Sequence, residues 1–153
     1  MLKEIDSISR INEDSNDSIK KADIQEELDK LSSKVYFYGG TTKIRKFSED
    51  QLNKIVEILQ KNRTLEVEVR GFYNGDGGRY FKDNNITTDV ARAQHIKNIL
   101  VARGVKENLV SAVGMGESKL DPSDEELMQK IEIDGEEFKW NRNMRVEIKI
   151  VKY

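Results

Sequence analysis

Arg92 is the residue whose type and position point most directly to binding chemistry. The apolar pattern after Thr87 places Arg92 in the first turn of an expected helix, where the helix dipole disfavours a cation by about a few tenths of a kcal/mol or more. Free backbone N–H groups gather at the same helix end, so a bound carboxylate would satisfy the guanidinium and the helix terminus together. Alternatively, the Arg92 stem packs beside Ile96 and Ile99 and its head pairs with a local aspartate.

Catalytic and metal chemistry find little support in the residue types. The chain has no cysteine and one histidine, which excludes disulfides, thiol catalysis and a histidine-rich metal site. That residue, His95, has no nucleophile or acid at a useful spacing. The acidic run 121–126 lacks the spacing of a calcium loop, and the glycines of 75–78 do not lead directly into a helix as a phosphate cradle would. We therefore expect a protein that is not an enzyme, with no cofactor and no metal.

The length and charge of the chain exclude several classes of protein. The 153 residues suffice for one domain with a modest extension. Charged residues make up 35% of the chain with a net charge of −2, so no basic stripe is available for nucleic acid. No stretch approaches the ~20 apolar residues of a membrane span, and the start lacks the apolar stretch of a secretory signal. We expect either a periplasmic or cell-envelope protein whose export signal was removed, or a protein of the cytoplasm or of a particle.

The elements that must position Arg92 are indicated by apolar spacing and turn residues. Alternating apolar residues over 65–69 predict a strand with one solvated face. Ser48, with Gln51 three residues on, forms a capping box and predicts that a helix begins there. Asp134-Gly135 between apolar pairs predicts a hairpin. The expected elements are a strand at 35–38, a helix from 48, a strand at 65–70, a helix from near 87 to 104, a short strand at 110–113, the hairpin near 131–140 and a final strand at 146–150. This order describes a two-layer α/β sandwich.

Residues 1–33 form a polar, charged extension ahead of a domain expected over 34–153. Apolar residues at a four-three-four spacing from Ile24 to Val35 mark one face of a helix that starts at about residue 22. This helix either packs on the domain or serves as a coiled-coil partner, although the sustained heptads of a coiled coil are absent. A weaker apolar stripe precedes it, at Ile5, Ile8 and Ile11.

Three motifs follow one another in the second half of the chain. They are Asn85-x-x-Thr88-Asp89-x-x-Arg92-Ala93-x-x-Ile96-x-x-x-Leu100, then Gly114-Met115-Gly116-Glu117-Ser118, then Asn143-Met144-Arg145-Val146-Glu147-Ile148. In type, order and spacing they resemble the helix pattern, the Gly-x-Gly-Glu-Ser turn and the closing strand of the OmpA C-terminal family, which includes Pal lipoproteins and flagellar-stator anchors. The resemblance covers about residues 35 to 150. It implies the β-α-β-α-β-β OmpA-like fold, with a mixed sheet and the hairpin near 131–140 as an insertion.

The resemblance also implies a ligand, because the family holds the diaminopimelate of peptidoglycan stem peptides without cutting the wall. Arg92 matches the family's arginine and would hold the ligand carboxylate. Gly71-Phe72-Tyr73-Asn74 stands where the family has Gly-His-Thr-Asp, so Asn74 replaces the carboxylate that would meet the ligand ammonium. Charge-assisted hydrogen bonds contribute ~1.5–3 kcal/mol against ~1 for neutral ones, so we expect this change to lower affinity about tenfold or more.

The candidate ligand-binding residues are Tyr73, Asn74, Asp76, Asn85, Asp89 and Arg92. Asp76, Asp83 or Asp89 would substitute for the missing carboxylate, or each is a turn or cap residue instead. Tyr73 would line the pocket mouth or cover the loop. Asn85 would contact the ligand or pin the loop, and Arg145 is expected to pair with a carboxylate near the sheet edge.

Two functions remain open at this point. The first is a non-catalytic peptidoglycan-binding module that anchors an outer-membrane-associated envelope assembly to the cell wall. Its partners would be the stem peptide and, through residues 1–33, other envelope or assembly proteins. The second is an OmpA-like structural part of a secretion apparatus or phage particle that has lost wall binding, which Asn74 and the missing export signal would suit.

Overall fold

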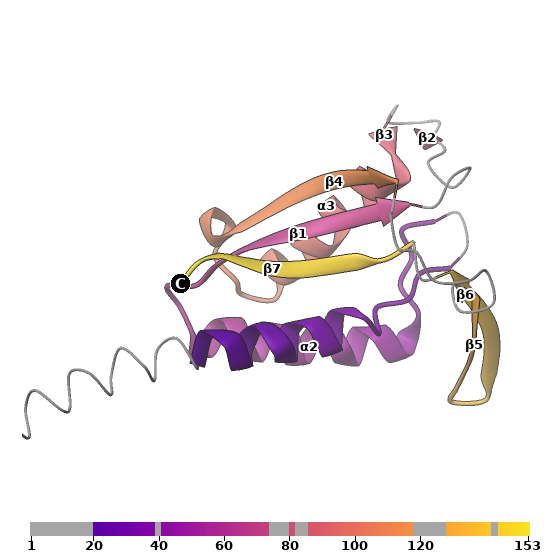
Figure 1. The fold of residues 1–153 in the computed structure, drawn as a ribbon, viewed down its shortest axis with the longest axis horizontal. Coiled ribbons are helices and arrows are strands. Elements are labelled where there is room, and N and C mark those ends of the chain that lie inside the picture. The colour runs from indigo at the N-terminus through magenta and orange to yellow at the C-terminus, as the bar shows by residue number, and fades with distance from the viewer. Residues whose placement is uncertain (1–19, 39–40, 74–79, 82–85, 118–127, 142–143) are drawn as a thin grey trace, which may run out of the picture.

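A three-stranded mixed sheet forms the centre of the computed structural model, which describes residues 20–38, 41–73, 80–81, 86–117, 128–141 and 144–153. Its strand order is β4-β1-β7. Strand β1 (Glu66–Tyr73) runs parallel to β4 (Val110–Glu117) and antiparallel to β7 (Val146–Lys152) (Figure 1). The sheet and its helices confirm the expected α/β fold class.

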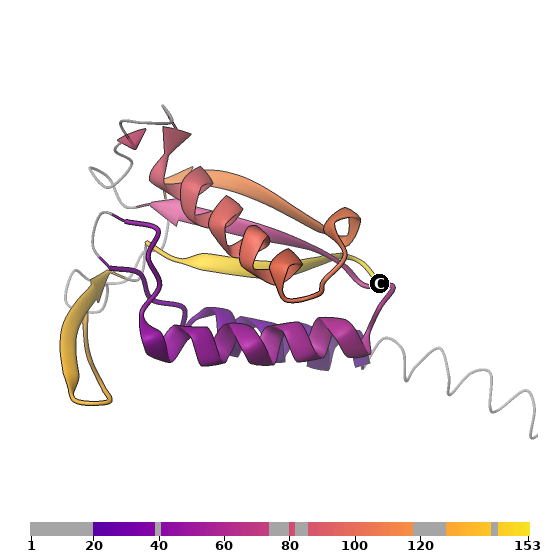
Figure 2. The ribbon, with the colours of Figure 1, turned by 180° about the vertical axis from the view of Figure 1, so that it is seen from behind.

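Two helices cover one face of this sheet. Helix α3 (Thr88–Ala102) lies across β1 and β4, and α2 (Lys46–Lys61) lies beside it, as the view from behind shows (Figure 2). The predicted alternation in β1 is confirmed, because Val67 and Val69 are buried while Glu66, Glu68 and Arg70 are half-buried. The apolar face of α2 that packs into the same core consists of Leu52, Ile55, Val56 and Leu59.

A further helix, over residues 20–32, packs beside β7. Leu28 is fully buried in the core, so the apolar face of this helix packs on the domain. The Gln25 amide nitrogen donates to the Ile148 carbonyl oxygen at 2.9 Å, and the Ile150 N–H donates to the Gln25 amide oxygen at 2.8 Å. The Gln25 side chain thus makes the two hydrogen bonds to β7 that the backbone of a neighbouring strand would make.

The predicted capping box at Ser48 is wrong. Helix α2 begins two residues earlier, at Lys46, with Arg45 at its N-cap and no side-chain cap. The Ser48 hydroxyl is fully buried, accepts the Tyr36 N–H at 2.7 Å and donates to the Lys34 carbonyl at 2.8 Å. Ser48 therefore satisfies the backbone of a distant segment instead of its own helix end.

The predicted strand at 35–38 is also wrong. Among the described residues, its ladder pairing is limited to a single antiparallel bridge between Phe37 and Ile44. Val35, Tyr36 and Phe37 are all buried, so this segment lacks the in-and-out alternation of a strand with one solvated face. Its β-forming residues are explained by their packing in the core.

The hairpin predicted around Asp134-Gly135 is confirmed. Strand β5 (Met128–Ile133) pairs with β6 (Glu136–Asn141) in a separate two-stranded sheet. Asp134 has φ 52° and Gly135 has φ 81°, the two positive values that a type I′ turn requires. The hairpin projects from the end of the main sheet, beyond the start of α2 (Figure 1).

The remaining elements frame α3. Two short strands, β2 (Tyr80–Phe81) and β3 (Ile86–Thr87), pair ahead of it, and a 3-10 turn at Glu107–Leu109 leads into β4. Thr87 occupies the N-cap without a side-chain cap, and Gly104 follows the helix with φ +108°, as its expected end requires. Within the described residues, no helix is both long and apolar enough to cross a membrane.

Candidate functional site

Two glycines let the start of α3 approach the sheet closely. A Cβ at Gly71 of β1 would overlap the Asp89 carbonyl oxygen. A Cβ at Gly114 of β4 would lie 2.6 Å from the Asp89 carboxylate and would also overlap Val90. Because neither side chain is present, the first turn of α3, which directly precedes Arg92, sits on β1 and β4.

Asp89 serves the fold at this contact. It is 3% exposed, and one carboxylate oxygen accepts the Gly116 N–H at 2.9 Å, which ties the end of β4 to the helix start. The other oxygen is buried and has no hydrogen-bond partner among the described residues. The role expected for Asp89 as a substitute ligand carboxylate stays a prediction, with this second oxygen as the acceptor.

Arg92 is the fifth residue of α3, just past the first turn in which it was expected, and is 2% exposed. Its Nε donates to the Thr41 carbonyl oxygen at 3.1 Å. The centre of the guanidinium lies 4.6 Å from the Phe37 ring and 5.9 Å from the Trp140 ring, both within range of a cation–π interaction. Both Nη atoms are buried without a hydrogen-bond partner in the part of the chain that the structure describes.

Among the described residues, this environment leaves the Arg92 cation with hydrogen-bond donors that have no acceptor. Burial lowers the pKa of Arg92 to about 10, so the side chain still carries its charge at neutral pH. No ion pair joins Arg92 to a carboxylate of the described residues, Asp89 included. Pairing of its head with Asp76 or Asp83, which lie outside the described residues, stays a prediction. Two parallel N–H donors match the two oxygens of a carboxylate, which is the strongest partner for a guanidinium.

The other predicted residues fall partly outside the described chain. Tyr73 ends β1, where its backbone is in register with Glu117. The remaining loop candidates, Asn74, Asp76, Asp83 and Asn85, lie outside the described residues. Arg145 pairs with Glu147 at 3.0 Å beside the edge strand β7 and lies over the Phe72 ring at 4.0 Å, which agrees with the expected carboxylate pairing.

Three partners of Arg92 were not found from the sequence. Thr41 contributes only a backbone oxygen, so its side chain gives no signal. Phe37 and Trp140 are far from Arg92 in the sequence, and their residue types fit a place in the core as well as a contact with Arg92. Among the described residues, no group of three or more His, Asp or Glu side chains could hold a metal ion.

Comparisons with known proteins show the family through one sequence model and the fold through solved structures. A model of the OmpA family matches residues 36–133. The C-terminal domain of Helicobacter pylori MotB is similar in fold, with a TM-score of 0.55 and 22% identity over 78% of this chain and 83% of that one. The peptidoglycan-associated lipoprotein from Burkholderia pseudomallei has a TM-score of 0.53 and 16% identity over 76% of this chain and 87% of that one.

A third similar structure is the cell wall anchor of the T6SS from Pseudomonas aeruginosa, with a TM-score of 0.50 and 22% identity over 73% of this chain and 71% of that one. The chain spans 58% of a longer periplasmic MotB domain that it also matches. No curated protein sequence matches it. Since the family model covers well over half of the residues, the chain belongs to the OmpA family, whose domains are non-catalytic peptidoglycan-binding modules.

Proposed function

We propose that this domain holds the stem peptide of peptidoglycan through a ligand carboxylate at Arg92 and so anchors an assembly of the cell envelope to the wall. The observation that carries the proposal is the pair of buried Nη atoms of Arg92, for which the described residues supply no acceptor. A buried polar group without a partner costs about 1–3 kcal/mol, and more when it is charged. A bidentate carboxylate would remove that cost.

Access to Arg92 sets a condition on this binding. Because only 2% of Arg92 is exposed, a ligand reaches both Nη atoms only if residues packed around the guanidinium move aside. The ammonium of the ligand would face Asn74, which accepts a hydrogen bond but carries no charge. We therefore expect weaker binding than in a family member with an aspartate at this position.

The family suggests a periplasmic, cell-envelope location, and wall anchoring there fits it. Residues 1–33 would then connect the domain to other envelope or assembly proteins. The boundary between this extension and the domain at residue 34 stays a prediction.

One observation favours a second candidate function, that of a structural part which no longer binds the wall. The stacking of Arg92 on Phe37 and its bond to Thr41 give the guanidinium a structural role without any ligand. In that case the domain would assemble with other proteins through its fold alone.

Retention of the purified protein on diaminopimelate-type peptidoglycan distinguishes the two functions. The unmodified chain should cosediment with the wall, and Arg92→Lys should lose about tenfold or more in affinity, because lysine keeps the charge but cannot make a bidentate contact. Arg103→Lys, at the other end of α3, is the matched control and should bind as the unmodified chain does. Circular dichroism would verify that both variants fold.

Asn74→Asp provides the second arm of the experiment. It should strengthen wall binding about tenfold by restoring a charge-assisted partner for the ligand ammonium. If the unmodified chain is not retained while Asn74→Asp is, the structural candidate is favoured. Retention that is equal in the unmodified, Arg92→Lys and Asn74→Asp chains would refute the role of this site.

A further inference from the structure

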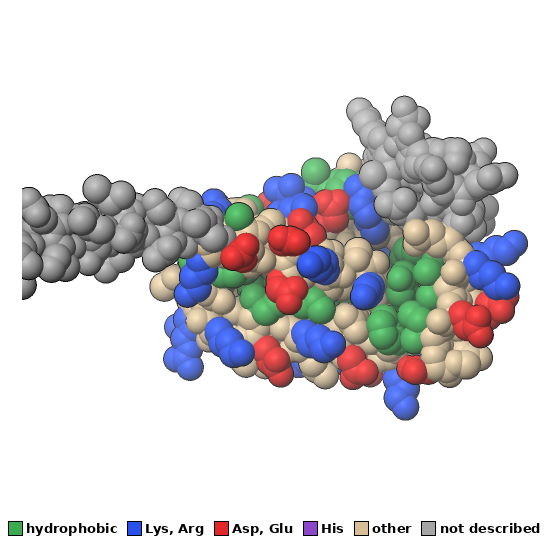
Figure 3. Space-filling model, turned by 60° about the horizontal axis from the view of Figure 1, so that its bottom comes forward, with side chains coloured by type: hydrophobic (Ala, Val, Ile, Leu, Met, Phe, Trp, Pro, Cys, Tyr) green, Lys and Arg blue, Asp and Glu red, His purple; other side chains and the backbone are tan. Residues whose placement is uncertain are grey.

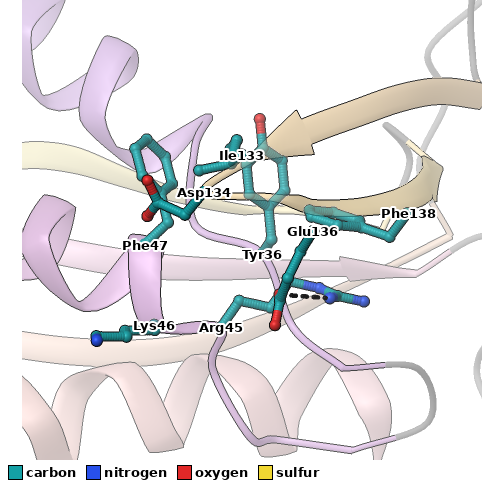
Figure 4. A pocket seen from close by; sticks show the side chains of 8 residues that line it. All are labelled: Tyr36, Arg45, Lys46, Phe47, Ile133, Asp134, Glu136 and Phe138. Atoms are coloured by element: carbon teal, nitrogen blue, oxygen red, sulfur yellow. Dashed lines mark ion pairs between the residues drawn. The ribbon is translucent and has the colours of Figure 1, made fainter.

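A pocket lies between the hairpin and the start of α2, and Arg92 is not among the residues that line it. Its volume is about 230 Å³. Four side chains give it an apolar lining, namely Tyr36, Phe47, Ile133 and Phe138. Four charged side chains surround these, namely Arg45 and Lys46 from the start of α2 and Asp134 and Glu136 from the hairpin (Figure 4).

Contacts around Arg45 fix the shape of this pocket. Its guanidinium lies 3.6 Å from the Phe138 ring and 4.4 Å from the Tyr38 ring, and the side chain is 17% exposed. Glu136 approaches it at 3.6 Å but remains 60% exposed, so the pair spans the pocket rim. Arg45 therefore connects the hairpin to the body of the domain with the pocket between them.

The size of the pocket selects the class of ligand. Pockets for drug-sized molecules usually measure ~300–1,000 Å³, so this one suits one or two aliphatic side chains of a peptide. Hydrophobic side chains also gather on the surface at this end of the molecule, next to charged ones (Figure 3). A peptide segment with spaced apolar residues and charges of both signs would match such a surface.

We propose that residues 1–19 of this chain fold back and lay the stripe Ile5, Ile8 and Ile11 across this pocket, with one or two of the isoleucines inside it. Residues 1–19 contain five acidic and two basic side chains, whereas the whole chain has a net charge of only −2. The stretch that leads into α2 is basic, with Lys43, Arg45 and Lys46 within four residues. The acidic segment and the basic approach to the pocket are thus complementary in charge.

Charges beside the isoleucines match the two walls of the pocket. Glu4 and Asp6 flank Ile5, and Arg10 precedes Ile11. The α2 wall supplies cations for the first pair, and the hairpin wall supplies carboxylates for the arginine. Burial of each isoleucine contributes about 1.5–3 kcal/mol, which is enough to offset part of the entropy of ordering the segment.

The length of chain permits this return. The helix over 20–32 begins at the end of the molecule opposite the hairpin (Figures 1 and 2). Its length is about 18 Å at 1.5 Å per residue. Residues 12–19 can span about 26 Å when extended, which exceeds the length of this helix, and residues 5–11 then remain for the pocket.

Energy transfer within the full-length chain tests the proposal. Trp140 is the only tryptophan, and its ring lies 5.5 Å from that of Tyr36, which lines the pocket. The chain has no cysteine, so Ser7→Cys offers a single site for a thiol-reactive acceptor dye. We expect strong transfer from Trp140 to the dye in native buffer, and a fall to the level of denatured chain when Ile5, Ile8 and Ile11 are all changed to serine.

A matched pair of charge reversals provides the control. Lys46→Glu at the pocket should reduce the ratio of docked to undocked chains about two- to fivefold. Lys54→Glu, an exposed position of the same helix that does not line the pocket, should leave it unchanged. The proposal is wrong if the serine variant keeps the transfer, if both reversals act alike, or if dilution abolishes the transfer, since that would indicate a second copy. None of these outcomes depends on peptidoglycan binding.

Discussion

Arg92 combines a candidate binding role with a cost in stability. Its guanidinium is buried, and Thr41 and two aromatic rings compensate part of the cost of burial. Its two Nη atoms have no acceptor within the part of the chain that the structure describes. Buried charges that lack full pairing are often less favourable than apolar side chains of similar volume. A residue retained in such a setting is better explained by the ligand it would bind than by the stability it brings.

Arg92→Met should therefore stabilise the domain by about 1–4 kcal/mol while it removes wall binding. Urea unfolding followed by Trp140 fluorescence measures the first effect, and cosedimentation measures the second. A loss of stability in this variant would show that the cation–π contacts outweigh the cost of burial.

The pH dependence of this difference has a definite sign. Burial lowers the folded-state pKa of Arg92 to about 10, so the unfolded chain binds more protons than the folded one above that pH. The cost of the buried charge is fully present below pH 10 and is relieved as the pH rises further. The advantage of Arg92→Met should accordingly be constant near neutrality and shrink above pH 10.

At the level of elements, Gln25 closes one edge of the sheet. Its amide occupies the carbonyl of Ile148 and the N–H of Ile150, and Lys149 between them pairs with Asp29 at 2.9 Å. The helix over 20–32 is thus attached to β7 by polar contacts as well as by its apolar face.

Gln25→Ala should cost about 1–3 kcal/mol, because two backbone groups of β7 lose their partner. The amide of Ile150 should exchange with solvent faster in this variant, as hydrogen exchange read by NMR would detect. Gln94→Ala removes an exposed glutamine whose side chain donates to Asn98, and this change should alter neither quantity. Unaltered exchange at Ile150 would show that the glutamine contacts contribute nothing to the edge.

The elements also show what sequence patterns can and cannot predict. The period of two in β1 and the Asp-Gly turn of the hairpin depend on neighbours in sequence, so both were predicted correctly. The role of Ser48 was missed because its partners, the backbone groups of Lys34 and Tyr36, come from a separate segment. Arg92 was singled out by its place in a helix, but its aromatic neighbours belong to segments that only the tertiary fold brings together.

For the whole molecule, the hairpin is attached to the body mainly through aromatic contacts. Phe138 meets the Tyr36 ring at 5.4 Å and the Arg45 guanidinium at 3.6 Å, and Trp140 meets the Tyr36 ring at 5.5 Å. A two-stranded hairpin is marginal by itself in water. The folded state of the hairpin should therefore depend more on these aromatic contacts than on the hydrogen bonds between β5 and β6.

Phe138→Ala should lower the free energy of opening the hairpin by about 1–3 kcal/mol while β1, β4 and β7 keep their protection. Site-resolved hydrogen exchange would measure both. Lys139→Ala, an exposed neighbour on the same strand, is the control and should leave the exchange unchanged. Equal loss of protection in the main sheet would mean that hairpin and body unfold as one unit.

The closed edge at β7 also limits how copies of this sheet can associate. Along β4, the other edge, residues 110–116 carry no charge and have no strand partner beyond β1 among the described residues. Open strand edges are the sites at which sheets join and aggregate. A sheet with one open edge can join only one other and then stops, whereas a sheet with two can add copies without end. The Gln25 side chain would thus limit edge-to-edge association to two copies and keep the domain from forming fibres.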